Sequence, residues 1–387
     1  MVNTWVSDCQ PASMAYLLPD RTLLYPCKQD NVVLDAVAAS GGRIIKYDWD
    51  GTILWDWQCN WQYQLHHDIE PLPNGNILAI AMEDLGGFRP DVVLEIEPIG
   101  TNDANLVWYW KVSEHMSDEL DNPYKFYSGA DYNQMDWNHF NAISLSNPND
   151  PYAGTYRILL SSRNWSEIYV INLHDNFGGD ILYRWGNPQN YGRGTQADRI
   201  LYAQHSVTEI KDSYPGGNNI LLFNNMNIQG QQDGSSIVME FTPPDDYHIE
   251  DGEPWGPTEP LWTFENGFYG AKQSGALRLP NGNTFVTVAG EGRMFEITDG
   301  GMIVWEHSGS NITFRAQKYS PYEFEQGDFN DDGLLNVLDI ITLVNFILSY
   351  DPESEGGDPM ENEGDLNNDN WVNVIDIVLL ANIILGN

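Results

Sequence analysis

Alternation of apolar and polar residues over short segments, interrupted by tight turns, is the strongest pattern in this chain. Residues 43–57 (RIIKYDWDGTILWDW) give the clearest example, because two runs of period two, rich in β-branched and aromatic residues, flank an Asp-Gly turn. This pattern predicts an antiparallel pair of strands. Similar pairs follow at 92–110, 167–185, 237–262 and 294–305. The tryptophans that close them, expected to share one position in the repeat, are Trp57, Trp110, Trp185, Trp262 and Trp305.

A second hairpin is predicted ahead of each pair. Turns such as 72–78 (LPNGNIL) and 279–285 (LPNGNTF) contain Asn-Gly, which favours a type I′ turn. Units of about four strands, repeated at spacings of roughly 45 to 75 residues, are typical of a β-propeller. With five units and a lone strand at 314–320, we predict a mainly β fold with five to six four-stranded blades. A β-sandwich is the alternative, which the repeated tryptophan strand disfavours.

The C-terminal part differs in pattern from about residue 325 onward. Two loops, 328–339 (DFNDDGLLNVLD) and 365–376 (DLNNDNWVNVID), place Asp or Asn at loop positions 1, 3, 5, 9 and 12. Oxygen atoms at this spacing bind calcium, together with the carbonyl of position 7. Apolar helices are expected at 340–348 and 377–385. The predicted ligands of two calcium ions are Asp328, Asn330, Asp332, Leu334, Asn336, Asp339, Asp365, Asn367, Asp369, Trp371, Asn373 and Asp376.

These patterns predict two domains, a propeller at 1–324 and a small α-helical calcium-binding domain at 325–387. The chain carries 18 basic and 56 acidic residues, a formal net charge of -38. Such a surface attracts cations and repels nucleic acid, so we expect no nucleic-acid partner. A run of about 18 apolar residues is missing from the sequence, so we also expect no membrane span. The first ten residues, MVNTWVSDCQ, lack the features of a signal peptide.

Three cysteines, Cys9, Cys27 and Cys59, lie near the N-terminus. This odd number allows one disulfide and one remaining thiol. A bridge between Cys9 and Cys27 is a plausible pairing, and three unpaired thiols are the alternative.

Histidines occupy what reads as one local position in three units: His67 in LHHDIEPLPNGN, His139 in DWNHFNAI and His205 in YAQHSV. The first strand of each blade lines the axis of a propeller, so these side chains are expected to face one another, with Ser274 and Arg315 at similar opening positions. They could ligate a metal, include a nucleophile with its helpers, or be structural. A zinc site would need three ligands within roughly 2.1 Å of one ion, and no cysteine or carboxylate is obviously placed to help.

Arg163 is expected on the strand that follows His139, where it could point into the channel. A guanidinium group fits the oxygens of a sulfuryl or phosphoryl group. A histidine nucleophile, two further donors and an arginine therefore suit transfer of such a group.

Several motifs, in this order, resemble the bacterial arylsulfotransferases over residues 14–320. They are HHDIEPLPNGN, DWNHFNAI, SSRNWSEI, RWGNPQNY, QHSV, LFNN, SGALRLPNGN and GRMFEI. The resemblance implies a six-bladed propeller that moves a sulfuryl group from an aryl sulfate to a phenol through a sulfohistidine, without a nucleotide sulfate donor. It implies that His205 is the nucleophile. His67, or the adjacent His66, would hold the sulfate oxygens together with His139 and Arg163.

Residues 327–387 resemble a type I dockerin, the calcium-folded docking module of secreted assemblies. The resemblance implies a secreted protein, extracellular or at the cell surface, whose partner is a cohesin-like domain or a neighbouring copy. Loop positions 10 and 11, which often contact the partner in that family, are Val337, Leu338, Val374 and Ile375. An apolar partner surface is therefore expected. A calcium-binding stabiliser without a partner is the alternative.

Two functions from different classes follow from these patterns. The first is a dockerin-tethered arylsulfotransferase. The second is a structural propeller subunit of an extracellular assembly or filament, joined to its neighbours by the dockerin. Binding of carbohydrate by exposed aromatic side chains is a weaker third reading, because blade packing explains most of the 14 tryptophans.

Overall fold

The computed structural model describes most of the chain, which forms two compact units. The described residues are 3–18, 20–30, 32–34, 39–146, 157–173, 179–226, 235–309, 314–319, 327, 329, 337–349, 364, 366 and 372–385. The larger unit consists of Met1–Leu18 and Thr22–Gln317, and the smaller one of Pro19–Arg21 and Lys318–Asn387. The expected domain boundary at 324/325 falls outside the described residues and stays a prediction.

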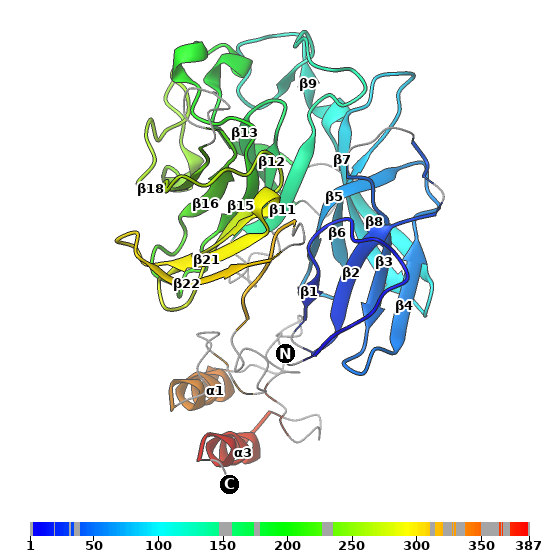
Figure 1. Ribbon diagram of the computed structural model, residues 1–387, viewed down its shortest axis with the longest axis vertical. Coiled ribbons are helices and arrows are strands. Elements are labelled where there is room, and N and C mark those ends of the chain that lie inside the picture. The colour runs from blue at the N-terminus through cyan, green and yellow to red at the C-terminus, as the bar shows by residue number, and fades with distance from the viewer. Residues whose placement is uncertain are drawn as a thin grey trace. The chain divides into compact units, whose positions relative to one another are not determined.

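The larger unit is a β-propeller with five four-stranded antiparallel blades (Figure 1). Blade 1 contains β1 (Tyr16–Leu17), β2 (Leu23–Lys28), β3 (Gly42–Tyr47) and β4 (Ile53–Gln58). Blade 2 contains β5 (Gln64–Pro71), β6 (Ile77–Met82), β7 (Asp91–Ile99) and β8 (Asp103–Lys111). Blade 3 contains β11 (Phe140–Ser146), β12 (Arg157–Ser162), β13 (Glu167–Asn172) and β14 (Ile181–Trp185). Blade 4 contains β15 (His205–Glu209), β16 (Ile220–Asn224), β17 (Ile237–Phe241) and β18 (Trp262–Phe264). Blade 5 contains β19 (Gly275–Arg278), β20 (Thr284–Val288), β21 (Arg293–Ile297) and β22 (Ile303–Ser308).

Short elements connect these blades. A parallel pair is formed by β9 (Met116–Ser117) and β10 (Phe126–Tyr127). The 3-10 turns are η1 (Val112–His115), η2 (Pro188–Tyr191), η3 (Gln196–Asp198), η4 (Asp245–Tyr247) and η5 (Ala289–Glu291). The prediction of a mainly β propeller with five to six blades is confirmed, because each expected strand pair forms the two outer strands of a blade.

Apolar side chains between successive blades hold the propeller together. One cluster joins blades 1 and 2 around Trp57, and the next joins blades 2 and 3 around Trp110. Trp185 packs between blades 3 and 4, and Phe223 between blades 4 and 5. Because each of these large side chains is almost completely buried, each contributes about 2–3 kcal/mol of apolar transfer free energy.

The closing tryptophans do not all share one position, which corrects the sequence alignment. Beside a bulge, Trp305 pairs with Glu296, as Trp55 pairs with Lys46 and Trp108 with Glu95. Trp57, Trp110 and Trp185 lie two residues further along their strands. Trp262 belongs to the first group, because its indole N–H donates to the Asp299 carbonyl as that of Trp55 donates to Asp103. Blades 1 and 2 carry tryptophan at both positions, so a closing tryptophan alone does not fix the register of the strand pair.

The two ends of the propeller cover its first blade and reach its axis. The N-terminal segment packs Trp5 against blade 1, where its indole N–H donates to the Asp48 carbonyl, 2.8 Å away. At the other end, the Ser274 N–H donates to the Phe314 carbonyl. The lone strand expected at 314–320 is not formed over 314–319, because this segment makes single hydrogen bonds and no ladder. Burial of the outer strand differs between the first and last blades. Trp55 and Trp305 occupy the same strand position, but Trp55 is 3% exposed and Trp305 is 43% exposed.

A disulfide joins Cys9 to Cys27, and Cys59 is a buried free thiol. The pairing considered from the sequence is therefore confirmed. Replacing both bridged cysteines with Ser is expected to lower the free energy of unfolding by about 3 kcal/mol, because the cross-link restricts the unfolded chain. Urea unfolding measures this change, with Cys59→Ala as the control that removes a buried sulfur but no cross-link. A double variant as stable as Cys59→Ala would contradict the expectation.

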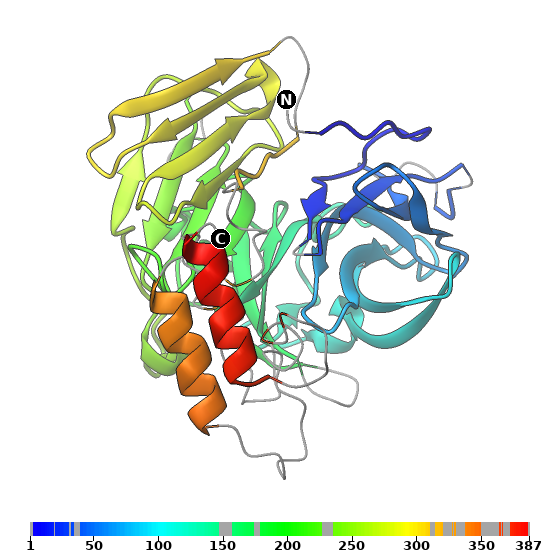
Figure 2. The same cartoon turned by 90° about the horizontal axis from the view of Figure 1, so that it is seen from below.

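The described residues of the smaller unit include two helices, α1 (Val337–Ser349) and α3 (Val374–Leu385), which lie side by side (Figure 2). Leu343 and Leu380 are fully buried between them. Both helices begin three residues earlier than the sequence pattern indicated. Positions 10 to 12 of each calcium loop thus already belong to the first helical turn.

Candidate active site in the histidine cluster

The three histidines approach one another, although they do not occupy one register position. His67 lies in a bulge of β5 between the paired residues Leu65 and Ile69, and His139 directly precedes β11. His205 opens β15 and pairs with Phe223. Both His67 (φ 57°) and His139 (φ 52°) adopt the left-handed backbone region, a costly conformation that is common at functional sites. The bulges thus turn side chains of different register toward one place.

Two of these rings line a shared cavity, and the third lies against one of them at an interplanar angle of 59°. His67 and His205 line a cavity of about 40 Å³. The ring centroids of His67 and His139 are 4.6 Å apart. Arg163 lies one residue beyond β12, in the turn and not on the strand as expected, and its N–H donates to the His139 carbonyl. The three histidines therefore lie together, and Arg163 is close enough for its charge to lower the pKa of His67 and His205.

Hydrogen bonds fix the orientation of the His205 ring and the ring nitrogen that carries its hydrogen. Its Nδ1 lies 2.7 Å from Asn225 Oδ1 and 3.0 Å from the Ala203 carbonyl. Asn225 Nδ2 donates to the carbonyls of Gly270 and Gln273, so Asn225 Oδ1 is an acceptor. The proton of neutral His205 therefore sits on Nδ1, which leaves a lone pair on Nε2.

Electrostatics keep this imidazole neutral. Burial lowers the pKa of His205 to about 3, aided by the nearby charges of His139 and Arg163 and opposed by the hydrogen bond with Asn225. The pKa of His67 also lies well below its ordinary range, chiefly through burial and then through His139, His66, His205 and Arg163. Both rings are therefore neutral near pH 7, and each carries a hydrogen on only one of its two nitrogens.

His139 instead faces a carboxylate. Its Nδ1 lies 2.7 Å from Asp136 Oδ2, and Asn164 Nδ2 donates to the Asp136 carbonyl, 2.6 Å away. Burial opposes ionisation of Asp136, but the hydrogen bond from His139 and nearby positive charge outweigh it and lower the Asp136 pKa. The carboxylate accepts the Nδ1 hydrogen of His139 and so fixes the orientation of this ring.

Sequence reasoning missed the residues that orient the histidines. Asp136 stands three positions before His139 in the DWNH motif, a spacing that could have indicated a local pair. Asp91, which contacts His66, lies on another strand, and Asn225 directly follows β16. No local pattern marks either of these two residues.

A second polar group occupies the axis beside the histidines. Asp68 Oδ2 lies 3.0 Å from Arg315 Nη2, and the Ser13 hydroxyl donates to Asp68 Oδ1. Ser274 and Arg315, expected at opening positions, both line the cavity with His67 and His205. Arg315 also donates to the Tyr16 hydroxyl, so it links the end of the propeller chain to its first two blades.

Glu70 belongs to the same cluster as Asp68 and Arg315, and it makes the free energy of unfolding depend on pH. Burial, and then the neighbouring Asp68, raise the pKa of the half-buried Glu70 to about 8. The folded protein therefore keeps a proton that the unfolded chain loses above its ordinary pKa of about 4.3, so stability falls as pH rises through this range. Glu70→Gln, which cannot ionise, is expected to match the wild type near pH 5 and to exceed it by about 1–2 kcal/mol near pH 9. Urea unfolding at both pH values tests this, with exposed Glu119→Gln as control. An equal effect of Glu70→Gln at both would contradict it.

Among the described residues, no group of three or more His, Cys, Asp and Glu side chains is arranged to hold a metal ion. The described residues therefore do not support the interpretation that the histidines form a zinc site. No helix in that part is long and apolar enough to cross a membrane.

Three of the expected calcium ligands, Asp339, Asn373 and Asp376, belong to the described residues of the helical unit. Asp339 and Asp376, at position 12 of their loops, are fully buried. Asp376 accepts hydrogen bonds from the N–H groups of Leu366 and Asn373, so its carboxylate folds back across its own loop. A buried carboxylate in a loop with an oxygen-only donor set fits a hard cation such as calcium. The other expected ligands lie outside the described residues: Asp328, Asn330, Asp332, Leu334, Asn336, Asp365, Asn367, Asp369 and Trp371.

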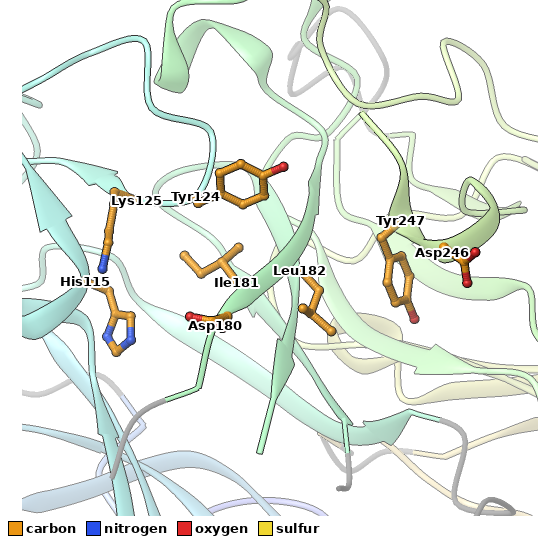
Figure 3. Close-up of a pocket in the computed structure, with 8 residues that line it drawn as sticks. All are labelled: His115, Tyr124, Lys125, Asp180, Ile181, Leu182, Asp246 and Tyr247. Carbon is orange, nitrogen blue, oxygen red and sulfur yellow. The ribbon is translucent and has the colours of Figure 1, made fainter. Parts of the chain in front are cut away.

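A larger hollow lies at the outer strand of blade 3 (Figure 3). It measures about 370 Å³, and its lining includes His115, Lys125, Ile181 and Tyr247. His115 stacks on Trp110 and contacts the Lys111 carbonyl, which gives this histidine a structural role. None of the convergent histidines contributes to the lining.

Comparison with known proteins gives two family matches. The family model described as arylsulfotransferase (ASST) matches residues 29–320. The model for the dockerin type I domain matches residues 326–385. No curated protein is significantly similar in sequence.

Solved structures give distant similarities. A Bacteroides caccae protein of unknown function is 12% identical, covering 80% of this chain and 86% of its own, with a TM-score of 0.45. Virginiamycin B lyase from Staphylococcus aureus is 11% identical over 80% of this chain and 73% of its own, with a TM-score of 0.37. A regucalcin from Agrobacterium tumefaciens is also 11% identical, over 76% and 72%, with a TM-score of 0.37. These scores are too low to bear on function.

Proposed function

Because the chain belongs to the arylsulfotransferase family and ends in a type I dockerin domain, we propose that it transfers a sulfuryl group from an aryl sulfate to a phenol through a sulfohistidine. The single observation that carries this proposal is the orientation of His205. Asn225 fixes its proton on Nδ1, and burial keeps the ring neutral, so Nε2 presents a lone pair at the cavity. A nucleophile prepared in this way is what attack on sulfur requires.

The first half-reaction forms the bond between His205 Nε2 and sulfur and breaks the bond between sulfur and the aryl oxygen. The phenolate leaves with the electron pair of that bond. Charge on the three other sulfate oxygens is held by Arg163, His139 and His67. The sulfo-imidazolium of His205 keeps its Nδ1 proton, whose hydrogen bond to Asn225 stabilises the positive ring.

The second half-reaction reverses these steps with a new phenol. The acceptor phenol loses its proton as its oxygen attacks sulfur, the electron pair of the bond to His205 Nε2 returns to the ring, and the neutral imidazole is restored. This proton balances the one that the phenolate released in the first step takes up. No nucleotide sulfate donor is needed, because donor and product are both aryl sulfates. The cavity of about 40 Å³ has room only for the small sulfuryl end of the substrate, so the aryl group lies outside it.

The dockerin domain is expected to attach the propeller to a partner protein. Type I dockerin domains bind calcium, and we expect two ions, one in each loop. The loop residues Val337, Leu338, Val374 and Ile375 are 50–66% exposed, which supports an apolar surface for a cohesin-like partner. Such modules belong to extracellular assemblies, so we propose that the protein is secreted.

The proposal is tested by release of nitrophenol from nitrophenyl sulfate in calcium-containing buffer, with and without phenol. Turnover that requires the phenol acceptor and no nucleotide sulfate is expected. No release from several aryl sulfates would overturn the proposal and favour a structural subunit of an extracellular assembly.

A further inference from the structure

A chain of three side chains stands behind the cavity face of His67. His66 Nε2 lies 3.1 Å from Asp91 Oδ1, and His66 Nδ1 lies 2.7 Å from His67 Nδ1. Both His66 and Asp91 are buried, with side-chain exposures of 1% and 0%. This arrangement is not required for binding sulfate, because only His67 reaches the cavity of the proposed active site.

The hydrogen bonds of Asp91 fix the protons at one end of this chain. Its Oδ2 accepts from Asn138 Nδ2, 2.9 Å away, and from the Phe140 N–H. With these donors the carboxylate stays an acceptor, so His66 Nε2 must carry a hydrogen that it donates to Asp91. The Asp91 N–H donates in turn to Asn138 Oδ1, which locks the two side chains together.

The two facing Nδ1 atoms share a single hydrogen. At 2.7 Å they form a hydrogen bond, in which one ring nitrogen donates and the other accepts. When the hydrogen is on His67 Nδ1, His67 Nε2 carries a lone pair. When it is on His66 Nδ1, His66 is an imidazolium paired with Asp91, and His67 Nε2 can carry a hydrogen while its own ring stays neutral.

We propose that Asp91 and His66 form a buried proton relay behind His67, by which His67 protonates the departing phenolate and later deprotonates the acceptor phenol. This inference rests on the proposed function. His67 is the catalytic residue of the relay, and Asp91 and His66 are positioning residues that act through it.

Protons are conserved over one catalytic cycle of the relay. In the first half-reaction, the departing phenolate takes the hydrogen from His67 Nε2, and the shared hydrogen moves from His66 Nδ1 to His67 Nδ1. In the second, the acceptor phenol gives its proton to His67 Nε2 as its oxygen bonds to sulfur, and the shared hydrogen returns to His66. His66 Nε2 keeps its hydrogen bond to Asp91 throughout. The loaded state is a buried ion pair, which Asp91 stabilises.

If Asp91 acts through the relay, the rate of sulfuryl transfer should depend on Asp91 more strongly for some aryl sulfate donors than for others. A nitrophenolate leaves without a proton, whereas an unsubstituted phenolate gains from one, and general acid catalysis contributes about 10²-fold or more. In a single turnover without acceptor, which follows the first half-reaction alone, Asp91→Asn is therefore expected to slow release from phenyl sulfate about 100-fold and release from nitrophenyl sulfate only about threefold. His66→Asn keeps a polar group near Nδ1 but cannot pass a proton, and is expected to show the same split.

Glu240→Gln is the matched control, because Glu240 is also a buried carboxylate with a cationic partner, Arg278, but does not contact the histidines. It should leave the ratio of the two donor rates unchanged. An equal loss with both donors in Asp91→Asn and His66→Asn would overturn the relay while leaving the proposed function intact.

A second measurement keeps the relay testable if transfer itself is not found. In ¹⁵N-histidine NMR of the wild type, His67 Nδ1 and Nε2 are expected to exchange protonation together with His66 as pH falls, and Asp91→Asn should abolish this coupling. Independent titration of the two rings would overturn the relay. Absence of transfer from every aryl sulfate would overturn the proposed function, and with it the catalytic role of the relay.

Discussion

Replacing His205 with Ala is expected to lower sulfuryl transfer by about 1,000-fold or more, because the side chain supplies the atom that bonds to sulfur. Arg163, His139 and His67 would still bind the sulfate, so donor affinity should change far less than the turnover rate. Steady-state release of nitrophenol in the presence of phenol, with kcat and KM determined separately, measures this difference.

Two further variants distinguish loss of the nucleophile from loss of structure. His205→Gln fills most of the same volume and should be as inactive as His205→Ala. His248→Ala removes an exposed histidine paired with Glu250 and should keep full activity. If His205→Gln retained transfer, the nucleophile would be another residue, and His67 would be the first candidate because it lines the same cavity.

Removal of calcium is expected to unfold the helical unit and leave the propeller folded. Without a cation the carboxylates of each loop repel one another, and the fully buried Asp339 and Asp376 lose their expected counter-ion. Saturating calcium at about 1,000 times its dissociation constant would stabilise such a unit by about 4 kcal/mol. Loss of the helical part of the circular dichroism spectrum on adding a chelator, restored by calcium, measures the effect.

Loop variants give the control for this experiment. Asp328→Ala and Asp365→Ala, each at position 1 of a loop, are expected to weaken calcium binding and partner binding together. Asp251→Ala removes an exposed carboxylate of the propeller and should change neither. A helical signal that persists in chelator would contradict the expected coupling of calcium binding to folding.

The sequence predicted the propeller because its signals are local. Period-two alternation, Asn-Gly turns and aromatic outer strands each depend on a few adjacent residues, and they placed every pair of outer strands. The register of Trp262 and Trp305 could not be predicted in this way. Blades 1 and 2 carry tryptophan at both of two alternate positions, so alternation alone does not show which of the two positions Trp262 and Trp305 occupy.

The site was predicted in part for the same reason. Histidine motifs at the start of successive units indicated which side chains meet at the axis. The groups that set their chemistry come from elsewhere: Asp91 from the third strand of blade 2 and Asn225 from the residue after β16. Their effect arises only from the approach of distant segments, so the tautomer of His205 could not be derived from its own sequence neighbourhood.

The central claim is that sulfur becomes bonded to His205, and trapping this intermediate tests it most directly. The protein would be mixed with an aryl sulfate in the absence of phenol, digested at neutral to alkaline pH and examined by mass spectrometry. We expect one added SO₃ group on the peptide that contains His205, lost on addition of phenol and missing from His205→Ala. Transfer to phenol without any modified peptide, or with the group on His67 or His139, would contradict the account.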